Sequence, residues 1–208
     1  MIQGVIFDMD GVLADTEHFY QCRREDYLDQ MDFPGPRGVD FVGSNERAIW
    51  ETLVPGDAEL REQMLQGYRA YRRFHPENYI KLADPQVKPL FEELHRRGLR
   101  VAIASSSDQK AIRRFMEAAG VTGLVDYVIS GEECAAHKPD PEIYLRAMAA
   151  LGLTPETAFA VEDSPTGIAA ARNAGMTVYA LRPRHSEKMD QSAANGILNS
   201  LAEVIEKL

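Results

Sequence analysis

The 208-residue chain is 45% hydrophobic and 26% charged, which is the composition of an ordinary globular protein and excludes a disordered or fibrous one. Its formal net charge of -9 opposes binding to nucleic acid, which attracts basic surfaces. No segment approaches the roughly 18 uninterrupted apolar residues of a membrane span, and the first residues do not resemble a signal peptide. We therefore expect a cytoplasmic protein with neither nucleic acid nor membrane as a partner, large enough to be stable as a monomer.

Short apolar runs alternate with amphipathic segments along most of the chain, a pattern typical of strand and helix units in a parallel sheet. Asp140 before Pro141 predicts the start of one helix, and Gly152 predicts its end. The alternation predicts a three-layer, Rossmann-like α/β core with a parallel sheet. Strands are expected at 5–7, 101–104, 127–129, 158–161 and 177–181, and helices at about 87–98, 112–120, 141–152, 165–175 and 201–208.

The stretch between residues 14 and 83 breaks this alternation. It is poor in strand-like runs, and its apolar residues have the spacing of amphipathic helices. Because this stretch follows the first strand, the predicted core is discontinuous. We expect residues 1–13 and 84–208 to form the core and residues 14–83 to form an inserted, small α-helical cap domain. The apolar positions of the cap are Phe41, Ile49, Trp50, Leu53, Leu60, Met64, Leu65 and Tyr68.

Polar residues follow three of the predicted strands where each strand ends. In open parallel sheets ligands bind outside the carboxyl ends of the strands, so these side chains are expected to lie together. One aspartate in such a place usually shapes a turn, but several carboxylates in one cleft repel each other unless a divalent cation lies between them. Mg²⁺ prefers oxygen ligands and completes its shell with water and substrate phosphate, so it is the expected cofactor. The residues concerned are Asp8, Asp10, Ser105, Ser106, Glu162 and Asp163, together with Lys138 before the helix that leads to the fourth strand.

Four segments resemble the motifs of the haloacid dehalogenase superfamily. FDMDGVLADTE resembles its DxDGxL signature, IASSS its second motif, HKPDPEIY its third motif with the lysine at Lys138, and VEDSPTGIAAARNAG its acidic fourth motif. The resemblance covers the first strand and the chain from Asp84 onward, and the most similar branch contains β-phosphoglucomutase and small sugar-phosphate phosphatases. It implies a magnesium-dependent phosphatase whose substrate is a small phosphorylated metabolite.

The resemblance also implies a role for each matching residue. Asp8 would attack phosphorus and form an aspartyl-phosphate, while Asp10 would protonate the leaving oxygen and then accept a proton from water. Ser105 would donate a hydrogen bond to the phosphoryl group, beside the backbone amide of Ser106, and Lys138 would offset charge on the nucleophile and the phosphate. Mg²⁺ would be held by Asp8, the backbone carbonyl of Asp10 and Asp163, with Glu162 either a direct or an outer-shell ligand.

Residues of the predicted cap are expected to select the substrate. Thr16 lies near the hinge, and FVGSNERAIW resembles a substrate-recognition loop of this branch. Trp50 and His75 are interpreted as structural because their neighbours give no ligand spacing. Ser107, before Asp108, is interpreted as a helix cap. The predicted substrate-binding residues of the cap are Thr16, Gly43, Ser44, Asn45 and Arg47.

Single residues distinguish the predicted phosphatase from other activities of the superfamily. Retention of Asp10 argues against carbon–halogen cleavage, and a phosphonoacetaldehyde hydrolase would need a cap lysine, whereas the only lysine between residues 14 and 83 is Lys81 at the hinge. Mutases carry a histidine where this chain has Tyr20, and His18 lies two residues away, pointing elsewhere on a helix. This favours a phosphatase and leaves a β-phosphoglucomutase as the alternative. A non-catalytic binding protein is less consistent with a complete set of motif residues.

Overall fold

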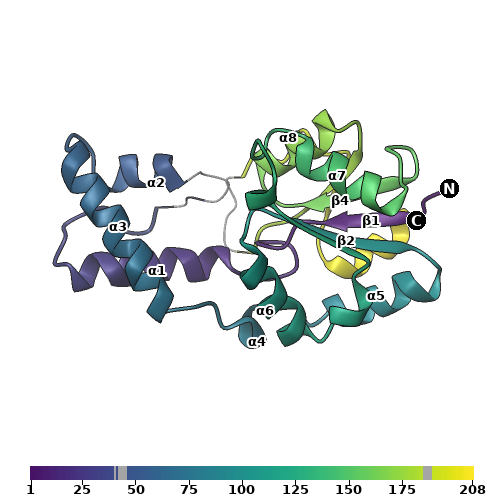
Figure 1. Cartoon of the computed structure of the whole chain (residues 1–208), viewed down its shortest axis with the longest axis horizontal. Helices are drawn as coiled ribbons and strands as arrows, with labels where there is room; N and C mark the ends of the chain where they lie inside the picture. Colours follow the sequence, from purple (N-terminus) through teal and green to yellow (C-terminus); the bar gives the residue numbers. More distant parts are fainter. Residues whose placement is uncertain (40, 42–45, 185–188) are drawn as a thin grey trace. The chain divides into compact units, whose positions relative to one another are not determined.

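The computed structural model describes residues 1–39, 41, 46–184 and 189–208, which divide into two compact units (Figure 1). Unit 1 comprises Met1–Asp15 and Tyr79–Leu208, and unit 2 comprises Thr16–Asn78. The two segments through which the chain leaves and re-enters unit 1 lie side by side. Ala14 forms an antiparallel bridge with Ala83, and the Asp15 amide donates to the carbonyl of Leu82 at 2.8 Å.

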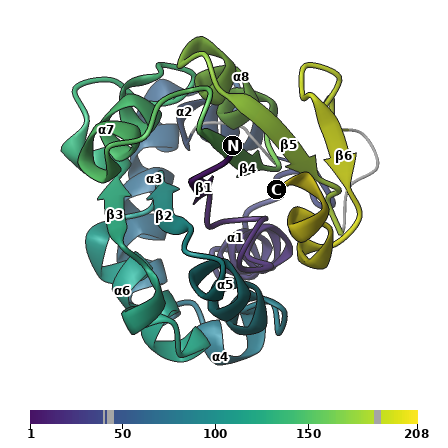
Figure 2. The same ribbon diagram turned by 90° about the vertical axis from the view of Figure 1, so that its right-hand side faces the viewer.

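Unit 1 is built on a six-stranded, fully parallel sheet with the strand order β3-β2-β1-β4-β5-β6. The central strand β1 is buried at every residue, because helices cover both faces of the sheet (Figures 1 and 2). This confirms the predicted α/β, Rossmann-like fold class. A sixth strand, too short to be predicted, extends the sheet at one edge. The strands are β1 (Gly4–Phe7), β2 (Arg100–Ser105), β3 (Tyr127–Ser130), β4 (Ala158–Glu162), β5 (Thr177–Leu181) and β6 (Gly196–Leu198).

The two faces of the sheet contribute to two separate hydrophobic clusters. Val5 and Phe7 of β1 pack into a cluster with residues of α5 and α6, while Ile6 packs into a second cluster with residues of α7 and α8. This division follows from the alternation of side chains along a strand. The helices of unit 1 are α4 (Tyr79–Leu82), α5 (Val87–Arg96), α6 (Gln109–Ala119), α7 (Glu142–Leu151) and α8 (Pro165–Asn173), with 3₁₀ turns at Thr122–Leu124, Gly131–Glu133 and Leu201–Lys207.

Two helix boundaries and the type of one helix differ from the sequence prediction. The N-cap of α7 is Pro141, and the Asp140 carboxylate accepts the Glu142 amide, so α7 begins one residue later than expected. The N-cap of α6 is Asp108, whose side chain accepts the Ala111 amide at 2.8 Å, so Ser107 is not the cap. The C-terminal segment is a 3₁₀ helix rather than an α-helix.

The described residues of unit 2 form three helices around a small core of their own. They are α1 (Glu17–Gln30), α2 (Glu46–Leu53) and α3 (Ala58–Phe74). Of the eight apolar positions predicted for the cap, four are buried in this core and four are partly buried and pack against it. Trp50 is 1% exposed, and its ring meets that of Tyr27 edge-on and that of Tyr68 at a tilt. In the described part of the chain, no helix combines the length and apolarity needed to cross a membrane.

Candidate active site

The candidate site lies at the carboxyl end of β1, between β2 and β4. Phe7, the last residue of β1, pairs with Ile103 on one side and with Val161 on the other. The Asp8 amide then donates to the Val161 carbonyl at 2.9 Å, which fixes Asp8 beside Glu162. The strand order reverses at β1, and such switch points are where open parallel sheets bind ligands.

Lys138 reaches this position from the loop before α7. Its Nζ lies 2.6 Å from Oδ1 of Asp8 and 2.6 Å from Oε1 of Glu162, and it also donates to the carbonyl of Ala104 at 3.1 Å. Burial alone would lower the pKa of Lys138, but the charges of Asp8 and Glu162 outweigh it and hold that pKa well above its usual range. Lys138 is therefore a permanent cation facing the predicted nucleophile.

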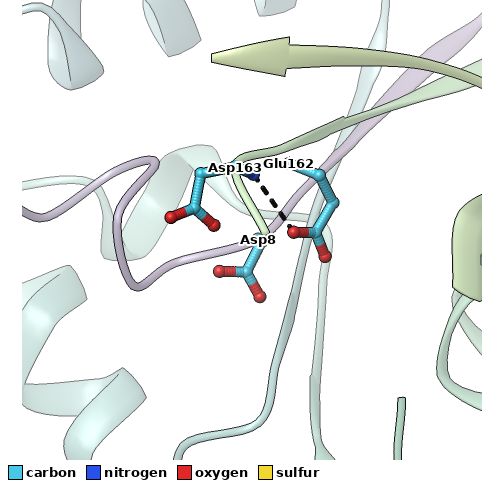
Figure 3. Close-up of side chains that lie close together, drawn as sticks. All are labelled: Asp8, Glu162 and Asp163. Carbon is cyan, nitrogen blue, oxygen red and sulfur yellow. Dashed lines mark hydrogen bonds between the residues drawn. The ribbon is translucent and has the colours of Figure 1, made fainter. Parts of the chain in front are cut away.

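Asp8, Glu162 and Asp163 form a buried acidic cluster (Figure 3). One carboxylate oxygen from each lies within 4.8 Å of the others, and the residues are 7%, 0% and 3% exposed. Burial raises the pKa of Asp8 well above its usual value, and Lys138 opposes this while Glu162 and Asp10 add to it. A divalent cation among these oxygens would lower that pKa again and keep Asp8 ionised. The oxygen-only donor set fits such a cation.

Two further residues, to which the sequence assigned no role, determine the position of Asp163. Gly11 has a φ of 79°, and a Cβ added there would lie 2.0 Å from Oδ2 of Asp163, so only glycine allows this approach. The buried Gln191 side chain donates to the carbonyl of Asp163 at 2.7 Å and to that of Leu181 at 2.8 Å. Gly11 lies within the first motif and could have been singled out there. Gln191 lies outside all four motifs and carries no signal in the sequence.

The serines after β2 have different surroundings. Ser105 is fully buried and its Oγ accepts the Ser107 amide at 3.0 Å, which leaves its hydroxyl hydrogen to donate elsewhere. Ser107 donates to Oδ2 of Asp10 at 2.7 Å, whereas Ser106 is exposed. Ser107, which was interpreted as a helix cap, thus holds the side chain of Asp10, the predicted general acid.

The residues predicted to bind substrate from the cap are placed less completely. Thr16 is the N-cap of α1, and Arg47 on α2 is exposed and pairs with Glu51 at 2.9 Å. Gly43, Ser44 and Asn45 lie outside the described residues. His75 stacks on Tyr71 with ring centroids 3.8 Å apart, in keeping with a structural role.

Fold and site together define an α/β protein with a cluster of buried ionisable side chains at a sheet switch point. The haloacid dehalogenase-like hydrolase family matches residues 5–181. Protein CbbY of Rhodobacter capsulatus is 30% identical to this chain, with 93% of this chain and 91% of that protein aligned. The β-phosphoglucomutase of Bacillus subtilis (strain 168) is also 30% identical, with 84% and 81% aligned.

A crystal structure of CbbY from Rhodobacter sphaeroides in complex with phosphate has the same fold, with a TM-score of 0.74 at 24% identity over 98% of this chain and 96% of that one. The chain belongs to the haloacid dehalogenase-like hydrolase family. This confirms the family indicated by the four motifs, and with it the prediction of an enzyme of the phosphoric monoester hydrolase class.

Proposed function

We propose that the protein is a magnesium-dependent phosphatase that hydrolyses a small phosphorylated metabolite through an aspartyl-phosphate on Asp8. The observation that carries the proposal is the contact between Lys138 Nζ and Asp8 Oδ1, at 2.6 Å beside a buried acidic cluster. A buried ammonium that touches a buried carboxylate neutralises charge where an anionic phosphoryl group would arrive.

Asp8, the backbone carbonyl of Asp10 and Asp163 would hold Mg²⁺. The ion, when bound, would offset negative charge on the transferred phosphoryl oxygens. The donor set supports this, because three buried carboxyl groups lie together and offer oxygen ligands, and the Lys138 ammonium touches two of them. Burial raises the pKa of Asp8 well above its usual value, Lys138 opposes this, and the neighbouring Glu162 and Asp10 add to it, so a cation beside Asp8 would favour its ionised form.

The reaction divides among this chain's own side chains. Asp8 attacks phosphorus, which breaks the bond to the leaving oxygen, and Asp10 gives that oxygen a proton. Asp10 then takes a proton from the water that attacks the aspartyl-phosphate, which restores Asp8 and releases inorganic phosphate. Ser107 orients Asp10 through the 2.7 Å hydrogen bond, and Ser105 has a hydroxyl hydrogen to offer the phosphoryl oxygens.

A β-phosphoglucomutase is the second candidate, and the 30% identity with the Bacillus subtilis enzyme of that name favours it. In a mutase the phosphoryl group passes to a second sugar hydroxyl instead of water. Position 20 is a tyrosine, without the imidazole that the resemblance would require for proton transfer at this place. We therefore infer that water is the acceptor.

The test is phosphate release from a panel of phosphorylated metabolites with Mg²⁺ and with chelator, together with a coupled assay for conversion of β-glucose 1-phosphate to glucose 6-phosphate. We expect magnesium-dependent phosphate release from at least one sugar phosphate, and its loss in Asp8→Asn. Efficient isomerisation with little free phosphate would show a mutase. Release that persists in Asp8→Asn would refute the covalent mechanism.

A further inference from the structure

The carboxylate of Glu162 has a hydrogen-bond donor at every acceptor position. Its Oε1 accepts from Lys138 Nζ at 2.6 Å and from the Tyr144 hydroxyl at 2.5 Å. Its Oε2 accepts from the Asp163 amide at 3.2 Å and, more weakly, from the Ser164 hydroxyl at 3.4 Å. A carboxylate offers about four lone-pair sites, so Lys138, Tyr144 and the Asp163 amide use three of them. The Ser164 hydroxyl, whose Oγ also lies 3.4 Å from Thr166 Oγ1, is placed at the fourth.

The backbone around Glu162 is shaped to hold it in this place. A Cβ added at Gly167, in the first turns of α8, would lie 2.0–2.1 Å from both oxygens and the carboxyl carbon of Glu162. The side chain therefore rests directly against the backbone of α8, close to the positive end of the helix dipole. Movement of the carboxylate would break contacts on all sides at once, because Glu162 is 0% exposed.

Tyr144 joins Glu162 to Lys138. It lies on α7, six residues after the lysine, and is fully buried. Its hydroxyl donates to Glu162, and its ring lies beneath the ammonium, with Nζ 5.1 Å from the ring centroid. Nζ is also 3.4 Å from the hydroxyl oxygen. Lys138 is thus held by an anion, by a ring face and by the Ala104 carbonyl, and its remaining contact is with Asp8.

We propose that Glu162 and Tyr144 are positioning residues that hold the ammonium of Lys138 on Asp8, and that Glu162 is not a direct ligand of the metal. The inference rests on the proposed function. Oxygens of Glu162 and Asp163 lie near enough for a shared ion, but Glu162 could ligate one only by giving up a donor it already has. Asp163 and Asp8 supply the carboxylate ligands instead.

The main test is Tyr144→Phe, which removes one hydroxyl and keeps the ring. Steady-state kinetics would give kcat and KM, calorimetric titration with Mg²⁺ alone would give the dissociation constant of the metal, and circular dichroism would give the melting temperature. We expect kcat to fall about tenfold, because the variant loses roughly one net charge-assisted hydrogen bond. KM and the dissociation constant of Mg²⁺ should each change less than about twofold. Tyr179→Phe is the matched control, because it removes a hydroxyl that makes no hydrogen bond within the described residues and should change none of these values.

Two outcomes would overturn the inference. A Mg²⁺ constant weakened about tenfold or more, with kcat restored at saturating metal, would make Glu162 a ligand that Tyr144 supports. A lower melting temperature with unchanged kcat would leave Tyr144 a purely structural role.

Glu162→Gln and Asp163→Asn extend the test should Tyr144→Phe fail to fold. We expect Asp163→Asn to weaken Mg²⁺ binding far more than Glu162→Gln does, and equal losses would overturn the inference. Calorimetry needs no substrate, so it tests the role of Glu162 separately from the proposed phosphatase activity. If no compound of the panel released phosphate, the proposed function would fail, while the ranking of the two variants would still decide whether Glu162 binds the metal. Wild-type protein that bound no Mg²⁺ would refute both.

Discussion

Replacing Gly167 by alanine should destabilise unit 1, although alanine within a helix is normally favoured over glycine by about 1 kcal/mol. The added Cβ would lie 2.0–2.1 Å from three atoms of the Glu162 carboxylate, so this side chain must move. Its two shortest bonds, to Lys138 and Tyr144, would then be lost or lengthened. At about 1.5–3 kcal/mol for each hydrogen bond to a charged group, the net cost is about 2–5 kcal/mol after the helix-propensity gain is subtracted.

The assay for Gly167→Ala is thermal unfolding by circular dichroism, where such a cost corresponds to a fall of roughly 4–20 °C for a chain of this size. Hydrogen exchange of peptides from β4 and α8 should rise. Fluorescence of Trp50, the only tryptophan, reports separately on unit 2. Gly123→Ala is the control, because a Cβ there meets nothing within 4 Å. A Gly167→Ala protein as stable as the wild type would refute the placement of Glu162 against α8.

Three further outcomes follow from the geometry of the site. Gly11→Ala should weaken Mg²⁺ binding about tenfold or more, since its Cβ would displace the Asp163 carboxylate. Gly152→Ala is the control, because Gly152 has a similar positive φ but open space around it, so this variant should lose only stability. Equal Mg²⁺ dissociation constants of the two variants by calorimetry would contradict this prediction. Ser107→Ala should lower kcat about tenfold with little change in KM, because Asp10 loses its 2.7 Å hydrogen bond; an unchanged kcat would argue against the positioning of Asp10.

The third outcome concerns pH. Burial holds the pKa of Asp8 well above its usual value, so in the metal-free protein protons compete with Mg²⁺ at a higher pH than they would for an exposed aspartate. The rise in melting temperature caused by Mg²⁺ should therefore be larger at about pH 8 than at about pH 5.5, where protons compete more strongly for this carboxyl. Scanning fluorimetry at both values measures it, and a larger rise at the lower pH would contradict the sign.

The arrangement separates two tasks among neighbouring carboxylates. Asp8 and Asp163 face the place proposed for the cation. Glu162 is buried more deeply and forms an ion pair with the ammonium of Lys138. Without Glu162 the ammonium of Lys138 would have Asp8 as its sole charged partner among the described residues, and would pair with the nucleophile alone. A second anion shares the ammonium, so Lys138 offsets the charge of Asp8 less completely, which would make Asp8 more basic in its proposed role as nucleophile.

Local sequence patterns were enough to predict the fold class and the residues at the ends of the strands. Buried parallel strands are apolar on both faces, so each appears as a short continuous run, and the first polar residue after the run marks the ligand-binding edge. Asp8, Glu162 and Asp163 were predicted from this position, whereas Lys138 was predicted from its place before a helix and from the resemblance of HKPDPEIY to a family motif. Eight of the apolar positions within or against the core of unit 2 followed equally from helical periodicity.

Only the tertiary structure decided which side chains these groups touch. Ser107 bonds Asp10 across 97 positions of sequence, Tyr144 bonds Glu162 across 18, and the Gln191 side chain reaches the Asp163 backbone across 28. Such pairs depend on the strand order and on the direction of each side chain, which no local pattern contains. The sequence by itself therefore determined the parallel α/β core and the chemical groups at its edge, whereas the packing of α7 and α8 on the sheet decided how Lys138 is held and which carboxylates remain available to a metal.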